Sequence, residues 1–281
     1  MEKYKDFDFE TVFDEFHSPI RQVHEKLAST TSIIPSVELQ QQRIAELSKI
    51  PCSFGLIVQS DLDKIIPVPG VRFPFESDFI NDKQFCKAIH PSYLIPFLIF
   101  AKFAYEMATR ADVKAEQILK ASYKIPIPLK LRGFNQYTWF IQNGFALSIN
   151  QNNQVLSHLN LYEFDRTCLT IANGEIENRF VEASFLIDNN LHEVFQSYLR
   201  ERISEYLVSL FKKQYKHWKI LELLKTDIKL SNQSLARSLQ LTEETIKSYS
   251  KDILQKLKSS LGYQFVTLRE AVISLSSVGY I

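Results

Sequence analysis

The sequence is poor in glycine, and its glycines are spread along the chain. Only 7 occur in 281 residues, and neighbouring glycines are always more than ten residues apart. Dinucleotide-binding turns and P-loops need clustered glycines, because the backbone must approach a phosphate closely. The sequence therefore excludes both motifs and argues against α/β enzymes with glycine-rich lids.

Long apolar runs and paired cysteines are also missing. No run of about 18 apolar residues occurs, so no membrane span is expected. The 3 cysteines are far apart and lack the spacing of a zinc site. The first residues are polar and acidic, unlike a secretory signal peptide. Together these features predict a cytoplasmic protein, and the hydrophobic fraction of 45% predicts a packed core.

Charge is unevenly distributed, although the net charge is only +1. Residues 212–281 contain 12 Lys and Arg against 6 Asp and Glu, whereas residues 1–211 contain 21 against 26. A basic tail on an acidic body is typical of proteins in which one end binds nucleic acid. Chance variation in surface lysines is the alternative explanation.

Residues 1–50 are predicted to be mostly helical, because apolar residues recur at spacings of three and four. A break at 33–36 precedes a second helix at 37–47, for which Ser36 is a candidate N-cap. These helices either pack on the next domain or form a cap or dimerisation element.

The next region, residues 51–188, changes to a strand-rich pattern. Pro126 and Pro128 cannot donate hydrogen bonds to a sheet, so their strand belongs at an edge or carries a bulge. One more hairpin is expected around Asn173 and Gly174. The predicted elements are a strand at 53–59, helices within 78–110, strands at 122–131, 136–149 and 155–164, and a hairpin turn at 150–153.

This order of elements resembles a PAS sensor domain over about residues 52–167. The resemblance rests on Ile89-His90-Pro91 before three antiparallel strands, on the pair Trp139-Phe140 and on Asp165-Arg166-Thr167. It implies a sensory role and a pocket for an apolar small molecule, although aromatic strand residues are more usually plain core. The candidate pocket residues are Phe134, Tyr137, Trp139 and Phe145.

No particular cofactor is predicted. The flavin-photosensor type of PAS domain has an Asn-Cys-Arg-type motif, which residues 84–87 do not match. Cys86 and His90 would share a face if their segment is helical and could then ligate a metal, but a buried cysteine near a capping His-Pro is the alternative. His17 and His24 also share a helical face and are predicted to lie at the surface. No nucleophile elbow or carboxylate pair stands out, so we do not expect an enzyme.

Residues 191–211 predict a long amphipathic helix with a single apolar stripe. This connecting helix either docks on the sensor domain or forms a short coiled coil between two chains.

The remaining residues, 213–281, predict four helices. Thr242 is the expected N-cap of the third helix, and Thr267 and Glu270 form a capping box that opens the fourth. In the third helix one face is apolar, and the opposite face is polar. The inward residues are Ile246, Ser250, Ile253, Leu254 and Leu257, and the outward residues are Glu244, Lys247, Ser248, Lys251 and Gln255.

This region resembles the LuxR-type DNA-binding domain over about sixty residues. The matching segments are Leu-Ser-Asn-x-x-Leu-Ala-x-x-Leu at 230–239, Thr-Ile-Lys at 245–247, Ile-Leu-x-Lys-Leu at 253–257 and Arg-Glu-Ala-Val at 269–272. The resemblance implies that the third helix enters the major groove of DNA. Lys247, Ser248 and Lys251 match its base-contacting positions, and Thr245 and Tyr249 match positions near phosphates. Asn232 and Gln233 in the second helix complete the predicted DNA-binding residues.

The chain also departs from the LuxR pattern. The Thr-x-Arg-Glu signature that usually precedes the first helix is replaced by residues 214–218, and Ser234 stands where the family has an acidic residue. The connections at 226–229 and 259–266 are predicted to be longer than usual.

The sequence thus predicts an α+β protein in which a PAS-like antiparallel sheet domain with flanking helices is followed by an all-α four-helix helix-turn-helix domain. The expected divisions are 1–50 (helical segment), 51–188 (sensor), 189–212 (connecting helix) and 213–281 (DNA-binding domain). The expected function is a dimeric, sequence-specific transcription regulator that binds double-stranded DNA under sensory control. The alternative is a ligand-binding or protein-interaction module whose helix-turn-helix does not bind DNA.

Overall fold

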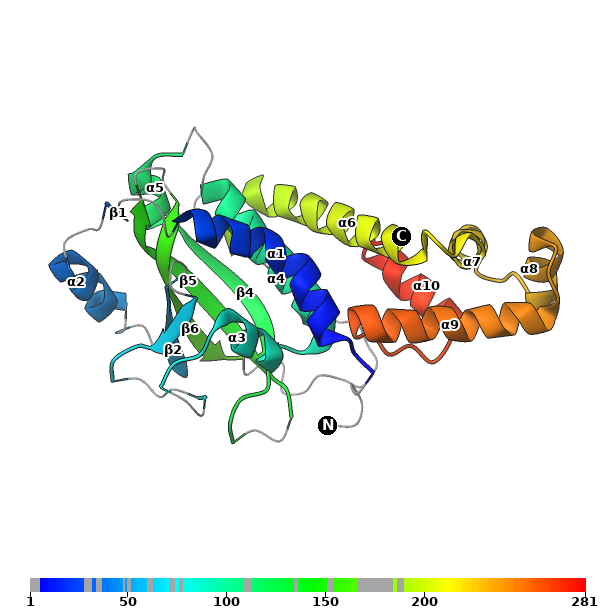
Figure 1. Ribbon diagram of the computed structural model, residues 1–281, viewed down its shortest axis with the longest axis horizontal. Coiled ribbons are helices and arrows are strands. Elements are labelled where there is room, and N and C mark those ends of the chain that lie inside the picture. The colour runs from blue at the N-terminus through cyan, green and yellow to red at the C-terminus, as the bar shows by residue number, and fades with distance from the viewer. Residues whose placement is uncertain are drawn as a thin grey trace. The chain divides into compact units, whose positions relative to one another are not determined.

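The computed structural model shows a mixed α+β fold that combines an antiparallel sheet with many helices, as expected for the broad class (Figure 1). It describes residues 6–27, 32–33, 37–47, 49, 52–59, 63–70, 74–75, 78–108, 113–133, 136–150, 154–165, 184–185 and 190–281. Their contacts divide them into two compact units. The smaller unit contains 6–12 and 196–281, and the larger contains the described residues of 13–165 with 184–185 and 190–195. No described helix has the length and apolar character needed to cross a membrane.

The larger unit is built on one sheet whose strand pairs are all antiparallel. The strand order is β3-β2-β6-β5-β4-β7, and β1 pairs with the end of β5. The strands are β1 Ser32–Ile33, β2 Phe54–Gln59, β3 Lys64–Pro67, β4 Ser122–Leu129, β5 Thr138–Asn150, β6 Val155–Phe164 and β7 Ser184–Phe185.

The long strands agree closely with the prediction, and β6 matches it to the residue. The β5–β6 hairpin closes at Asn150, whose side-chain oxygen accepts a hydrogen bond from the Gln154 amide at 3.0 Å. The short strand β3 was not predicted, because it stands directly before the turn at Pro69 and Gly70. Ser36, residues 151–153 and the hairpin expected around Asn173 and Gly174 lie outside the described residues.

The two prolines of β4 occupy an edge, as predicted. Pro126 and Pro128 pair with Ile141 and Trp139 of β5 on one side. On the other side the two-residue β7 pairs only with Tyr123 and Lys124, and an isolated bridge between Leu129 and Ile89 uses the Pro128 carbonyl but no proline nitrogen. The missing N–H groups of the prolines therefore interrupt no strand pairing of the described sheet on that side.

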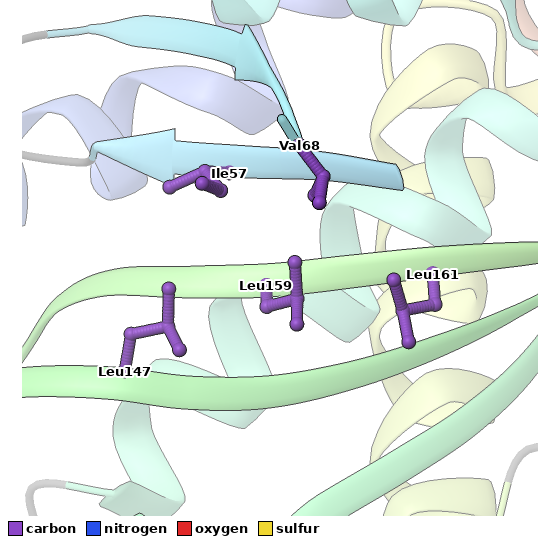
Figure 2. Close-up of a cluster of buried hydrophobic side chains, with 5 residues drawn as sticks. All are labelled: Ile57, Val68, Leu147, Leu159 and Leu161. Carbon is purple, nitrogen blue, oxygen red and sulfur yellow. The ribbon is translucent and has the colours of Figure 1, made fainter. Parts of the chain in front are cut away.

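The helices α1 to α4 of the larger unit agree with the predicted helical regions, whereas the short helix α5 was not predicted. Ile44 and Leu47 of α2 pack against a cluster on one sheet face, formed by Ile57, Val68, Leu147, Leu159 and Leu161 (Figure 2). Burying each such side chain contributes roughly 1.5–3 kcal/mol to folding. The helices are α1 Phe9–Leu27, whose first residues belong to the smaller unit, α2 Val37–Leu47, α3 Asp82–Ala88, α4 Pro91–Ala108 and α5 Ala115–Lys120.

The predicted connecting helix is present as α6, Asn190–Phe211. Phe195, Leu199, Ile203 and Leu207 of its apolar stripe are buried within the single chain, whereas Val194 stays exposed. The smaller unit continues with α7 Tyr215–Thr226, α8 Asn232–Leu239, α9 Glu243–Leu261 and α10 Leu268–Ser277.

Gly144→Ala is expected to destabilise the larger unit by about 2 kcal/mol, because a Cβ atom there would overlap the Tyr123 ring on the neighbouring strand. Replacing Tyr123 by leucine in the same chain should remove most of that cost. Urea unfolding of both single variants and the double variant measures this coupling. If the Gly144→Ala cost is the same with and without the ring, the close packing is not the cause.

Candidate nucleic-acid interface and internal cavity

A tight turn joins α8 to α9 in the smaller unit. Gln240 adopts a left-handed conformation with φ 54° and ψ 50°, and the Leu241 amide donates to the Ala236 carbonyl at 2.9 Å. Thr242 then caps α9 through its hydroxyl, which accepts from the Thr245 amide at 3.2 Å. The N-cap prediction is confirmed, and only residues 240–242 separate α8 from α9.

The inward face of α9 is apolar and packed. Ile246, Ile253 and Leu257 are buried as predicted, while Ser250 and Leu254 are only half-buried. The helix is longer than expected, because it continues to Leu261, which is also buried. The neighbouring helices complete this core with Ile220, Leu221 and Leu224 of α7, Leu235 and Ala236 of α8, and Leu268, Ala271, Val272 and Leu275 of α10.

Helix α10 also fixes the connection before α8. Thr267 and Glu270 form the predicted capping box at its start. Arg269, one residue before Glu270, donates from Nε to the Ile228 carbonyl at 3.2 Å and from its terminal guanidinium nitrogen to the Leu230 carbonyl. The turn that precedes Ser231, the N-cap of α8, is therefore held by a guanidinium from the last helix.

The outward face of α9 is exposed along its whole predicted length. The five outward residues that the sequence predicts, Glu244, Lys247, Ser248, Lys251 and Gln255, are all exposed. Lys247, Ser248 and Lys251 come together within about one turn of this face. Their exposure agrees with a contact surface, but it does not by itself identify the partner.

The other predicted DNA-binding residues lie in different settings. Thr245 is half-buried, and its hydroxyl lies 3.0 Å from that of Thr242. Tyr249 is half-buried with its ring 4.3 Å from the His217 ring. Asn232 and Gln233 form the first turn of α8, a different helix, where Gln233 is exposed and Asn232 is half-buried.

The four lysines of α9 fall into two pairs. Lys256 Nζ donates to the Leu210 carbonyl at the end of α6 at 2.6 Å, and Lys258 Nζ lies 2.6 Å from the Asp6 carboxylate. Lys247 and Lys251, by contrast, make no ion pair within the part of the chain that the structure describes. The C-terminal pair of lysines therefore holds the unit together, and the N-terminal pair faces solvent with its charge available.

The larger unit contains a partly open cavity of about 430 Å³ against one face of its sheet. Leu56 of β2, Gly144 of β5 and Tyr162 of β6 belong to the sheet wall, and α1, α3, α4 and α5 provide most of the opposite walls. Because side chains alternate along a strand, His158, Asn160 and Tyr162 face this cavity while Leu159 and Leu161 face the core cluster on the other side.

None of the three described aromatic residues that were expected to line a pocket lines this cavity. Trp139 is fully buried with its ring edge-on to Tyr93 at 4.9 Å, and Tyr137 packs against the His90 ring at 4.7 Å. Phe145 packs against the core cluster on the opposite sheet face, and Phe134 lies outside the described residues. The lining residues of β5 are Gln142, Gly144 and Ala146, which are polar or small positions in an apolar strand. That alternation is the signal that could have identified them.

A chain of polar side chains crosses the sheet wall of the cavity. Gln142 Nε2 donates to the Tyr123 hydroxyl at 3.0 Å, and this hydroxyl donates to Asn160 Oδ1 at 2.9 Å. Burial raises the pKa of both Tyr123 and Tyr162, so both remain neutral phenols. Asn160 lies near the Tyr162 hydroxyl and lowers the pKa of Tyr162, but burial raises this pKa by more.

The histidine predictions need two corrections. Cys86 and His90 do not share a helix face, because α3 ends at Ala88 and Ile89 is extended. His17 is not at the surface: it is only 5% exposed, lines the cavity, and lies with Nε2 3.0 Å from Asp82 Oδ2. The apolar stripe of α1 buries it together with Phe13, on whose ring it stacks. The side chain of His24 lies outside the described residues, and the described residues contain no group of three metal-ligating side chains.

His90→Gln should make folding less sensitive to acid. Burial lowers the pKa of His90 from 6.5 to about 4. As the pH falls below 6.5 the unfolded chain takes up a proton there, while the folded chain does not until about pH 4, so His90 progressively destabilises the fold across that window. Urea unfolding at several pH values should show a steeper loss of stability for the parent than for the variant. Parallel pH profiles would contradict this account.

Comparisons with known proteins give little information about this chain. No family model matches the sequence, and no curated protein matches it. Among solved structures, the chain has a likeness to the crystal structure of the phage VqmA–DPO complex, with 12% identity and a TM-score of 0.21. The match covers 68% of this chain and 69% of that one. A TM-score this low establishes neither a shared fold nor a shared function.

Proposed function

We propose that this chain is a sequence-specific DNA-binding transcription regulator, in which α7–α10 form a LuxR-type helix-turn-helix and a PAS-like larger unit supplies sensory control. The observation that carries the proposal is the division of the α9 lysines. Lys256 and Lys258 bond within the unit, whereas Lys247 and Lys251 lie on the exposed face opposite the buried stripe. Two cations presented by one rigid helix suit a polyanionic partner.

The geometry of α9 fits the major groove. A helix of this length extends for roughly 28 Å and is narrow enough to lie in that groove. Lysine side chains there can bind O6 and N7 of guanine, and Ser248 can bind either class of base edge. Glu243 and Glu244 in the first turn would repel phosphates, so these two carboxylates would have to point away from the backbone of the duplex.

Helix α8 supplies contacts of a different kind. Its N-cap hydroxyl, from Ser231, accepts from the Ser234 amide and lies 3.0 Å from the Ser234 hydroxyl. The hydroxyl does not cap the amides of Asn232 and Gln233, so at the positive end of the helix dipole these two can meet a phosphate. The excess of basic residues in 212–281 adds sequence-independent affinity through release of counterions. Phosphate contacts then position the unit, and the α9 side chains specify the sequence.

The remaining expectations complete the proposal. The predicted divisions 1–50, 51–188, 189–212 and 213–281 are retained as a helical segment, a PAS-like sensor, a connecting helix and a DNA-binding domain. A cytoplasmic homodimer would read two half-sites about one helical turn apart. No catalytic role is proposed for any residue.

A second candidate is a signalling module whose helical unit binds another protein. The exposed apolar side chains Val266 and Ile273, just before and within α10, favour it, because such residues can contact a protein partner. Salt dependence separates the two candidates. Duplex binding that weakens steeply with salt supports DNA recognition, and absence of duplex binding at low salt supports the protein partner.

Lys247→Ala and Lys251→Ala should each weaken binding to a mixed-sequence duplex and reduce the slope of log affinity against log salt by about 1. The reason is the loss of one cation close to the phosphates and bases. Fluorescence anisotropy at several salt concentrations measures both quantities. Lys120→Ala, at the end of α5 in the larger unit, is the matched control and should leave both unchanged. If neither α9 variant alters affinity or slope, this face is not the DNA interface.

Lys256→Met should lower stability and leave the salt dependence of DNA binding unchanged, the reverse of the effect expected for Lys247 and Lys251. Its ammonium group donates to the last turn of α6 and to Gln214, so its loss should lower the free energy of unfolding by about 1.5 kcal/mol. The salt slope of DNA binding should not change, since this lysine is engaged within the unit. Chemical denaturation and the anisotropy titration together check this result. A changed slope with unchanged stability would show that the lysine pairs are wrongly assigned.

A further inference from the structure

Two side chains on the sheet wall of the cavity, Gln142 and Tyr162, each carry a buried polar atom that makes no hydrogen bond of ordinary geometry with a described residue. Gln142 is 1% exposed and its Oε1 accepts no such bond, and the hydroxyl of the fully buried Tyr162 makes none either, although Asn160 lies near it. Leaving such a group unsatisfied costs about 1–3 kcal/mol. Both side chains line the cavity, so the cost can be recovered by a molecule bound there.

The charge of that molecule is restricted by the lining. No lysine or arginine is present among the described residues that line the cavity, and its two histidines are His17, which lies against Asp82, and His158, so an anion would meet no permanent counter-charge. The one carboxylate of the lining, Asp82, already lies against His17. The Tyr123 and Tyr162 phenols are held neutral by burial, and burial likewise raises the pKa of the Cys86 thiol. A charged ligand would therefore lose its hydration without gaining a strong ion pair to compensate.

Most of the remaining wall is apolar or aromatic, including Phe85, Phe97, Phe100 and Leu98. The volume of about 430 Å³ falls within the range of pockets for small molecules. We propose that this cavity binds one uncharged, largely apolar molecule of about two rings, which carries an N–H or O–H donor for Gln142 Oε1 and an acceptor for the Tyr162 hydroxyl. This proposal deepens the sensory part of the proposed function by naming the chemical class of the ligand.

Four probes of one shape test the class directly. They are naphthamide, acetonaphthone, naphthoate and naphthamidine, all substituted at the same ring position, and they differ in charge and in the donor group. Ligand-detected NMR titration of the full chain gives each dissociation constant. Naphthamide should bind tightest, the ketone about fivefold more weakly because it lacks the donor, and the two ions at least about tenfold more weakly. The proposal is overturned if either ion matches naphthamide, if the ketone does, or if neither neutral probe binds at roughly 1 mM.

Two variants locate the contacts. Gln142→Met removes the acceptor and should abolish the preference for naphthamide over the ketone, while Gln59→Met, the same substitution outside the cavity, should preserve it. Tyr162→Phe removes only a hydroxyl that makes no hydrogen bond of ordinary geometry within the described protein, so the chain should keep most of its stability while its affinity for naphthamide falls about fivefold. Unchanged affinity in Tyr162→Phe would overturn the assigned geometry even if the Gln142 variant fails to fold. Because the assay contains no DNA, its failure would leave the DNA-binding proposal standing, and the reverse also holds.

Discussion

The orientation of α9 depends on the burial of one apolar stripe. Ile246, Ile253, Leu257 and Leu261 are 0–3% exposed, and each contributes roughly 1.5–3 kcal/mol by leaving water. A helix held this way cannot rotate without exposing its stripe, so the opposite face is fixed as well. The exposed positions of Lys247 and Lys251 are thus a consequence of packing, and the capped turn from Gln240 to Thr242 only sets where the helix begins.

The strands of the larger unit also have two different faces, because side chains alternate along a strand with a period of two residues, compared with 3.6 in a helix. One face of each central strand fills a dry cluster with leucine and isoleucine, and the other carries glutamine, asparagine, tyrosine and glycine along the cavity wall. Tyr123 and Gly144 show how closely this wall is fitted, because the ring occupies the space that any Cβ atom would need. Buried polar groups of this kind destabilise a fold unless they are satisfied, which is why the cavity is better explained by ligand binding than by packing.

Local signals in the sequence were enough to predict much of this structure. The strand 155–164, the helix 37–47 and the caps at Thr242 and Thr267 each follow from a few adjacent residues, and the structure has all of them. The failures concern contacts between distant segments. His17 was predicted to lie at the surface, but α3, which is remote in sequence, places Asp82 beside it. The aromatic residues of β5 were predicted to line a pocket, but the register of the strand directs them to the face opposite the cavity. Periodicity shows that a strand has two faces, but only the helices packed against it decide which face is hollow.

The bonded and the free lysines of α9 could not be distinguished by pattern either, because Asp6 and the carbonyl of Leu210 are remote in sequence. The most direct test of the central claim is selection of bound duplexes from a random DNA library by the full-length chain. The account predicts enrichment of paired half-sites with guanine at fixed positions, and loss of that enrichment when Lys247 and Lys251 are both alanine. No enrichment by the parent chain, or the same enriched sites with the double variant, would contradict it.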